Sequence, residues 1–207
     1  MRHKNIFRTF VLALALLVGL YAEGTVTAAS VMDAMRAKFS TAKNVEVLFT
    51  LRSDGESEQG SAIVSGARFF STTPRMNVWY DGRTQWTMLH STGEVNISEP
   101  TPEELTASNP FTVLNNYASM YNIRRLPDEA GLRRVELTPK AANTGIASVA
   151  ISCSASTGWP SSVTVVFSDR RSVSMTVDSI RAIGAQPASV FVYDDKKFPA
   201  TEIIDLR

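Results

Sequence analysis

Cysteine and histidine are scarce in this sequence of 207 residues, which contains one of the first and two of the second. Cys153 has no partner for an internal disulfide, so the fold must rest on packing alone. The strand-like residues beside it predict a buried structural thiol. His90 is the one histidine beyond the first 28 residues. Zinc sites that take several His or Cys ligands are therefore excluded by count.

An excess of charge of one sign is also missing. The chain has 21 basic and 20 acidic residues, and removal of residues 1–28 leaves 18 and 19, a net charge of −1. Binding to nucleic acid needs a strong basic excess, and binding to an anionic lipid surface needs a polybasic segment. We expect neither kind of partner.

Long apolar runs are absent except near the N-terminus, where one extends from Phe10 to Leu20. Small residues follow it over 25–29, and three basic residues precede it: Arg2, Lys4 and Arg8. This order is typical of a secretory signal peptide. An uncleaved membrane anchor is the alternative, but a spanning helix needs roughly 20 apolar residues.

We expect residues 1–28 to act as this signal peptide, with a cut near Ala28 or Ala29. Export across a bacterial inner membrane would then leave residues 29–207 in the periplasm. That length suits a single domain. We expect the mature chain to be a monomer.

Catalytic motifs are missing as well, with no G-x-S-x-G elbow, phosphate-binding loop or dinucleotide fingerprint. A Ser-His-Asp or Cys-His site would have to use His90, whose position before a polar turn favours an exposed surface residue. The acidic pairs 103–104 and 194–195 fit a helix start and a turn better than a glycosidase site. Residues 96–98 match a glycosylation sequon but fit a strand end. We expect no enzyme activity, no metal and no cofactor.

The residues that are present predict a helix at the start of the mature chain. Val31, Met35 and Phe39 recur at a spacing of four, which is typical of an amphipathic helix. Ser30 and Asp33 resemble a capping box at its beginning.

A long β region follows this helix. Residues 45–51 alternate between apolar and other side chains, as in a strand with one buried face. Asp54-Gly55 and Asp81-Gly82 are typical of tight hairpin turns. The same reasoning predicts further strands over residues 58–65, 68–72, 76–80, 84–89, 94–98, 123–126, 132–138, 147–154, 161–167, 172–182, 189–193 and 201–206.

Two short helical segments interrupt the strands. One begins at residues 100–105, and Asn109 with Pro110 begins the other. So many sequential strands twist and curl. We therefore predict a mainly β fold with a few α-helices: a strongly curved antiparallel sheet, an open or half β-barrel, with helices covering the concave face. A closed barrel and a two-sheet sandwich also fit the pattern.

Aromatic residues gather on successive predicted strands. The pairs Phe69-Phe70 and Trp79-Tyr80 each place one ring on either face of the sheet. These rings either fill a core or line an apolar cavity suited to acyl chains. From alternation and the stripe of the second helix, the candidate cavity residues are Phe49, Leu51, Phe70, Trp79, Trp86, Met88, Phe111 and Leu114.

Residues 79–86 carry a D-G-x-T-x-W pattern, in which Asp81-Gly82 forms the turn and Trp86 follows. Residues 94–98, the P-T-P-E-E-L segment at 100–105 and Asn109-Pro110 come after it in order. This succession resembles the shorter periplasmic proteins of the LolA-like lipoprotein carrier family, over most of the mature chain. The resemblance implies an open β-barrel lidded by helices.

The resemblance also implies a function, that of a carrier whose apolar interior takes the acyl chains of lipoproteins or another lipid. Its partners would be a releasing complex at the inner membrane and an acceptor at the outer membrane. The better-known carriers have an Arg-Pro pair before the D-G-x-T-x-W turn, where this chain has Thr73-Pro74-Arg75, so that arginine's role is not carried over to Arg75. The alternative is a non-enzymatic envelope module for protein interaction or lipid sensing.

Overall fold

The computed structural model describes residues 26–207, so almost all of the predicted signal peptide lies outside the described residues. Helix α1 (Ala28–Ala42) begins after Thr27, whose side chain accepts a hydrogen bond from the backbone N–H of Ser30 at 3.1 Å. The prediction that Ser30 caps the helix is therefore wrong, because Ser30 already lies in its first turn. Asp33 instead accepts hydrogen bonds from Arg36 and from the hydroxyl of Tyr117.

Within residues 26–207, twelve strands form one sheet, which the chain builds in two halves that meet where β1 pairs with β11. The first half is a meander of β1 (Asn44–Ser53), β2 (Glu56–Ser65), β3 (Arg68–Thr72), β4 (Met76–Tyr80), β5 (Gln85–Leu89) and β6 (Glu94–Ser98). The second half runs through β7 (Tyr121–Glu129), β8 (Leu132–Pro139), β9 (Ile146–Ser154), β10 (Pro160–Phe167) and β11 (Ser172–Ala182). The last strand, β12 (Glu202–Asp205), lies at the edge beside β6.

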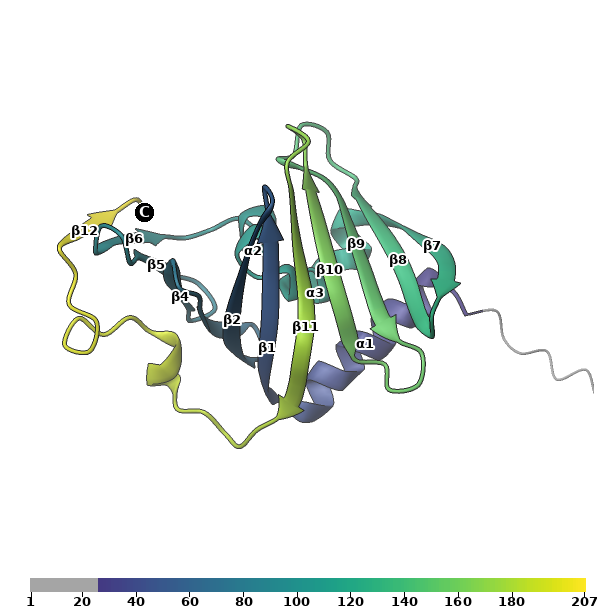
Figure 1. Ribbon diagram of the computed structural model, residues 1–207, viewed down its shortest axis with the longest axis horizontal. Helices are drawn as coiled ribbons and strands as arrows, with labels where there is room; N and C mark the ends of the chain where they lie inside the picture. Colours follow the sequence, from purple (N-terminus) through teal and green to yellow (C-terminus); the bar gives the residue numbers. More distant parts are fainter. Residues whose placement is uncertain (1–25) are drawn as a thin grey trace, which may run out of the picture.

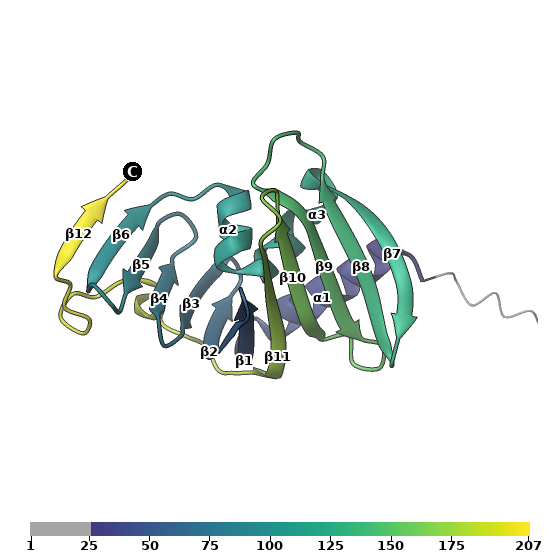
Figure 2. The ribbon, with the colours of Figure 1, turned by 45° about the horizontal axis from the view of Figure 1, so that its top comes forward.

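The sheet is strongly curved and open, with the helices on its concave face (Figure 1, Figure 2). Its edge strands are β7 and β12, and they do not pair with each other. The predicted fold class is confirmed, and a closed barrel is excluded for the part of the chain that the structure describes.

Two details differ from the sequence-based prediction. Residues 189–193 do not form a strand, because η2 (Ala188–Phe191) is a 3₁₀ turn whose Phe191 packs against β3 and β4. The sheet is also not antiparallel throughout, since β12 pairs with β6 in parallel. Both differences arise because the chain crosses the outer face of the sheet before it reaches the edge.

The helical interlude consists of α2 (Pro102–Ser108), the 3₁₀ turn η1 (Pro110–Thr112) and α3 (Val113–Met120). Thr101 and Glu104 form a capping box at the start of α2. The side chain of Asn109 accepts a hydrogen bond from the backbone N–H of Phe111, as the predicted cap requires. These contacts fix the position of η1 over the sheet.

The main core lies between the helices and the concave face. Met32 and Met35 of α1 are fully buried against it. Cys153 is a buried free thiol in the same core, as predicted, and burial raises its pKa. Tyr117 of α3 donates a hydrogen bond to Asp33 of α1 at 2.8 Å and so ties the two helices together. Among residues 26–207, no helix is long and apolar enough to cross a membrane.

A second apolar cluster, which we call the outer cluster, lies on the opposite face of β3 and β4. It comprises Phe70, Trp79, Phe191, Tyr193 and Phe198. The ring centroid of Trp79 lies 5.5 Å from that of Tyr193 and 5.0 Å from that of Phe198. The yellow-green C-terminal segment in Figure 1 supplies the last three residues as it runs from β11 to β12.

Candidate functional site

An apolar pocket of about 360 Å³ lies between the concave face of the sheet and the turn that joins α2 to α3. We call it the inner pocket. Strands β1 to β5 supply one side, β10 and β11 supply the other, and η1 covers it. Its large apolar lining residues include Phe49, Phe69, Met76, Phe111, Phe167 and Met175.

The position of Phe49 in this pocket depends on a glycine in the neighbouring strand. Phe49 of β1 pairs with Gly60 of β2 and is almost completely buried. A Cβ atom on Gly60 would lie 2.5 Å from two ring carbons of Phe49 and 2.8 Å from the backbone oxygen of Thr72. Glycine therefore leaves the space that the Phe49 ring occupies.

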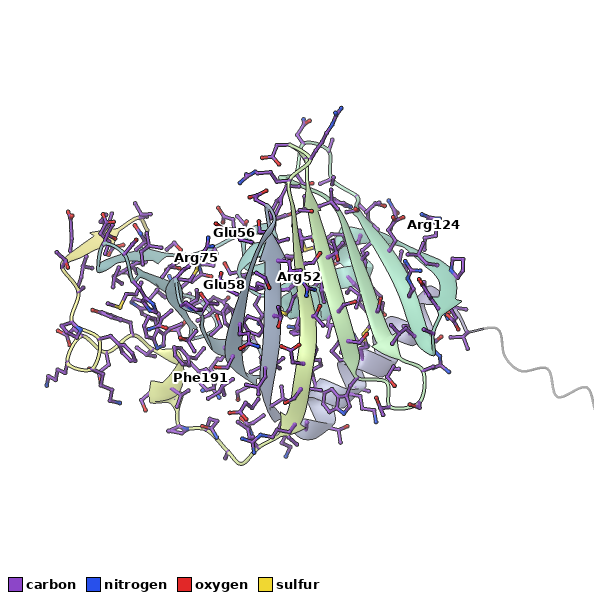
Figure 3. All side chains as sticks on the ribbon, in the orientation of Figure 1. Arg52, Glu56, Glu58, Arg75, Arg124 and Phe191 are labelled. Atoms are coloured by element: carbon purple, nitrogen blue, oxygen red, sulfur yellow. The ribbon has the colours of Figure 1, made fainter. Side chains whose placement is uncertain are left out.

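Three charged residues lie at the rim of the inner pocket: Glu56, Glu58 and Arg75. The guanidinium of Arg75 forms an ion pair with the exposed carboxylate of Glu56. Its Nε lies 3.6 Å from Oε2 of Glu58, whose side chain is only 19% exposed. Glu56 and Glu58 together raise the pKa of Arg75. In Figure 3 the three side chains lie close together beside β2.

A second pocket, of about 810 Å³, lies between α1, the first three strands and the helical interlude. Its lining mixes apolar residues with polar ones, among them Arg36, Lys43 and Asn115. Phe111 and Asn109 line both pockets, so η1 stands between them. The ring of Phe111 is held there by Phe39 of α1, with the ring centroids 5.5 Å apart.

The eight residues that the sequence nominated for a cavity do not all lie on the side of the sheet that the helices cover. Phe49, Leu51 and Phe111 line the inner pocket, and Leu114 lines the second pocket. The other four line neither pocket, because their strands turn them toward the outer face: Phe70, Trp79, Trp86 and Met88. Whether any of the eight contacts a ligand remains a prediction.

The register of the strands explains this division. Val45 pairs with Val64, Val64 with Phe69, and Phe69 with Tyr80. Directly paired residues share a face, so Phe69 and Tyr80 face the helices with Val45. The adjacent rings must then point away. The short turns at 54–55 and 66–67 fix which residues of β1, β2 and β3 pair. They do not say which face of the sheet meets the helices.

Other residues considered for chemistry are spread over the structure. His90 is exposed, and its Nδ1 lies 3.0 Å from the carbonyl oxygen of Pro74. Glu104 belongs to the capping box of α2, and Asp194 pairs with Lys197. No group of three or more metal-ligating side chains occurs within residues 26–207. The rim residues Glu56, Glu58 and Arg75 were not nominated, since their meeting depends on the pairing of β2 with β3.

Comparison with known proteins places the chain in a family. No curated protein matches the sequence. Among solved structures, an uncharacterised conserved protein from Thermus thermophilus has a TM-score of 0.58 at 9% identity, over 86% of this chain and 98% of that one. A LolA superfamily protein from Nitrosomonas europaea has a TM-score of 0.46 at 11% identity, over 81% and 98%. The family model described as outer membrane lipoprotein carrier protein LolA matches residues 21–165, and the chain therefore belongs to this LolA family.

Proposed function

We propose that the protein is a periplasmic carrier that shields the acyl chains of lipoproteins, or a related hydrophobic ligand, in its inner pocket during transfer toward the outer membrane. In this proposal it receives its cargo from a releasing complex at the inner membrane and passes it to an outer-membrane acceptor. It works without a cofactor and without catalysis. Family membership supports this proposal.

The observation that carries the proposal is the apolar inner pocket between sheet and helices. Its volume of about 360 Å³ falls in the range of roughly 300–1,000 Å³ that small-molecule sites occupy. Each methylene group removed from water stabilises the complex by about 0.8 kcal/mol. Entry of an acyl chain into such a pocket is therefore strongly favourable. The outer cluster, in contrast, is already covered by the C-terminal segment of the protein itself.

Filling the inner pocket tests the proposal. Ser71 of β3 lines the pocket, and Ser61 of β2 lies on the other face of the sheet, with both half-buried. Ser71→Phe therefore places a ring in the pocket, and Ser61→Phe is the matched control. Each protein is purified from periplasm, and its bound lipid or acylated protein is identified by native mass spectrometry after a check of folding by circular dichroism.

We expect the wild type and Ser61→Phe to carry lipid or acylated protein and Ser71→Phe to carry none. Equal loading of the two variants would mean that the ligand binds elsewhere. A wild-type protein that is always free of ligand would contradict the carrier function. It would favour the alternative of a non-enzymatic envelope interaction module.

A further inference from the structure

The rim of the inner pocket contains a carboxylate oxygen that lacks a hydrogen bond. Oε2 of Glu58 is buried and has no hydrogen-bond partner among the residues that the structure describes. Its nearest cationic contact is Nε of Arg75 at 3.6 Å, which exceeds the length of a hydrogen bond. A buried acceptor without a donor is unfavourable. A ligand that donates a hydrogen bond to this oxygen would remove that cost.

Arg75 does not supply that donor because its guanidinium is directed to another carboxylate. Its Nη2 donates to Glu56, which lies further out at the surface. The side chains of Arg75 and Glu56 are more than half exposed, whereas that of Glu58 is 19% exposed. Because Arg75 pairs with Glu56 at the surface, Glu58 is the carboxylate that lies nearer the pocket interior.

The charges around the pocket favour a positive head group. The charged lining residues are two glutamates and one arginine, a net charge of −1. An anionic head would meet both carboxylates, and a neutral head would leave the net charge unbalanced. A primary ammonium would neutralise the charge and also provide the missing N–H donor.

We propose that the inner pocket selects amphiphiles whose head group carries a primary ammonium, which donates to Glu58 while the apolar chain lies against Phe49 and Met175. This inference rests on the proposed function and names the class of ligand that the pocket takes. Glu58 is then a specificity-determining residue, and Arg75 competes with the ligand for it. The walls of the pocket supply the affinity for the chain, and the rim selects the head group.

A series of ligands with one chain length separates the two contributions. Dodecylamine, dodecyltrimethylammonium, dodecanol and dodecanoate are titrated below their micelle concentrations against a neutral fluorescent probe, N-phenyl-1-naphthylamine, bound to the mature protein. We expect dodecylamine to bind about tenfold more tightly than dodecanol, as one charge-assisted hydrogen bond implies. The trimethyl analogue has the same charge but no N–H donor, so it should bind more weakly than the amine.

Glu58→Gln should remove the preference for the amine over dodecanol. Glu46→Gln is the control, because Glu46 is also a half-buried strand carboxylate paired with an arginine, Arg181, but lies on the outer face. Arg75→Gln should strengthen the preference, since it removes the competitor. A lysophosphatidylethanolamine tested beside dodecylamine distinguishes a phospholipid source of the ammonium, if it binds more tightly, from an amine without a neighbouring phosphate.

The inference is overturned if dodecanoate binds as tightly as dodecylamine, or if Glu58→Gln keeps the full preference while remaining folded. Equal binding of dodecylamine and dodecanol would overturn the selection of the head group and leave the carrier function standing. Failure of all four ligands to displace the probe would overturn both.

Discussion

Gly60→Ala is the perturbation that tests the construction of the inner pocket most sharply. The new methyl carbon would lie 2.5 Å from the Phe49 ring and 2.8 Å from the carbonyl oxygen of Thr72. The ring is the far end of a side chain and can move, but the carbonyl belongs to the backbone of β3. We therefore expect Phe49 to be pushed into the pocket and β2 to shift slightly.

The expected cost follows from two opposing effects. Overpacking of a well-packed site costs about 1–3 kcal/mol. Replacing glycine by alanine in a strand stabilises the protein by roughly 0.5–1 kcal/mol. The net loss in the free energy of unfolding should thus lie between about 0 and 2.5 kcal/mol. The affinity for an apolar ligand should fall because the displaced ring occupies the pocket.

Urea unfolding and displacement of the fluorescent probe measure the two effects. Gly145→Ala is the control, because a Cβ there meets nothing within 4 Å. Phe49→Leu should relieve the clash, so the cost of Gly60→Ala should be smaller in that background, with a coupling energy of about 0.5–3 kcal/mol. Additive costs in the double variant, or a Gly60→Ala protein with wild-type stability and binding, would refute the described contact between Phe49 and Gly60.

Three further predictions concern contacts outside the inner pocket. Phe191→Ala should speed proteolytic cleavage of the C-terminal segment, since Phe191 is fully buried and Val192 is 36% exposed; Val192→Ala is the control, and equal cleavage rates by mass spectrometry would contradict it. Tyr117→Phe should lower the free energy of unfolding by about 1 kcal/mol, measured in urea, through loss of the bond to Asp33. Cys153 should react with a thiol reagent at pH 8 only after unfolding, because burial and its raised pKa keep it protonated; rapid reaction of the native protein would refute this.

Most strands could be predicted from the sequence because alternation and turn residues act locally. β3, β4 and β11 have the predicted bounds, and Asp54-Gly55 lies at its predicted turn. The open, curved sheet followed from the number of sequential strands. The predicted N-cap of α1, Ser30, lies three residues after the observed one, Thr27, because serine and threonine both favour a helix start.

The faces of the aromatic strands were harder to assign from the sequence. Adjacent rings such as Phe69 and Phe70 make both faces apolar, and alternation alone does not say which of them meets the helices. The outer face of β3 and β4 can be apolar because the segment between β11 and β12 covers it, through long-range contacts that no local pattern indicates. The rim ion pair of Arg75 with Glu56 likewise depends on the pairing of β2 with β3, which brings the start of β2 beside the turn after β3.

The predicted cut near Ala28 or Ala29 has a structural consequence, because it would remove Thr27, the N-cap of α1. Either cut would also remove Ala28, which packs in the main core. The cleavage site itself remains a prediction, which the intact mass of the mature protein would test.

The central claim is that an apolar ligand enters the inner pocket, and the chain's own methionines report on it. Met76 and Met175 line the inner pocket, Met88 lies on the outer face, and Met32 is buried in the main core. With ¹³C-labelled methionine methyl groups, titration with dodecylamine or a bacterial lipid should shift the NMR signals of Met76 and Met175 and leave those of Met88 and Met32 in place. Shifts confined to Met88, or no shifts at saturating ligand, would contradict the account.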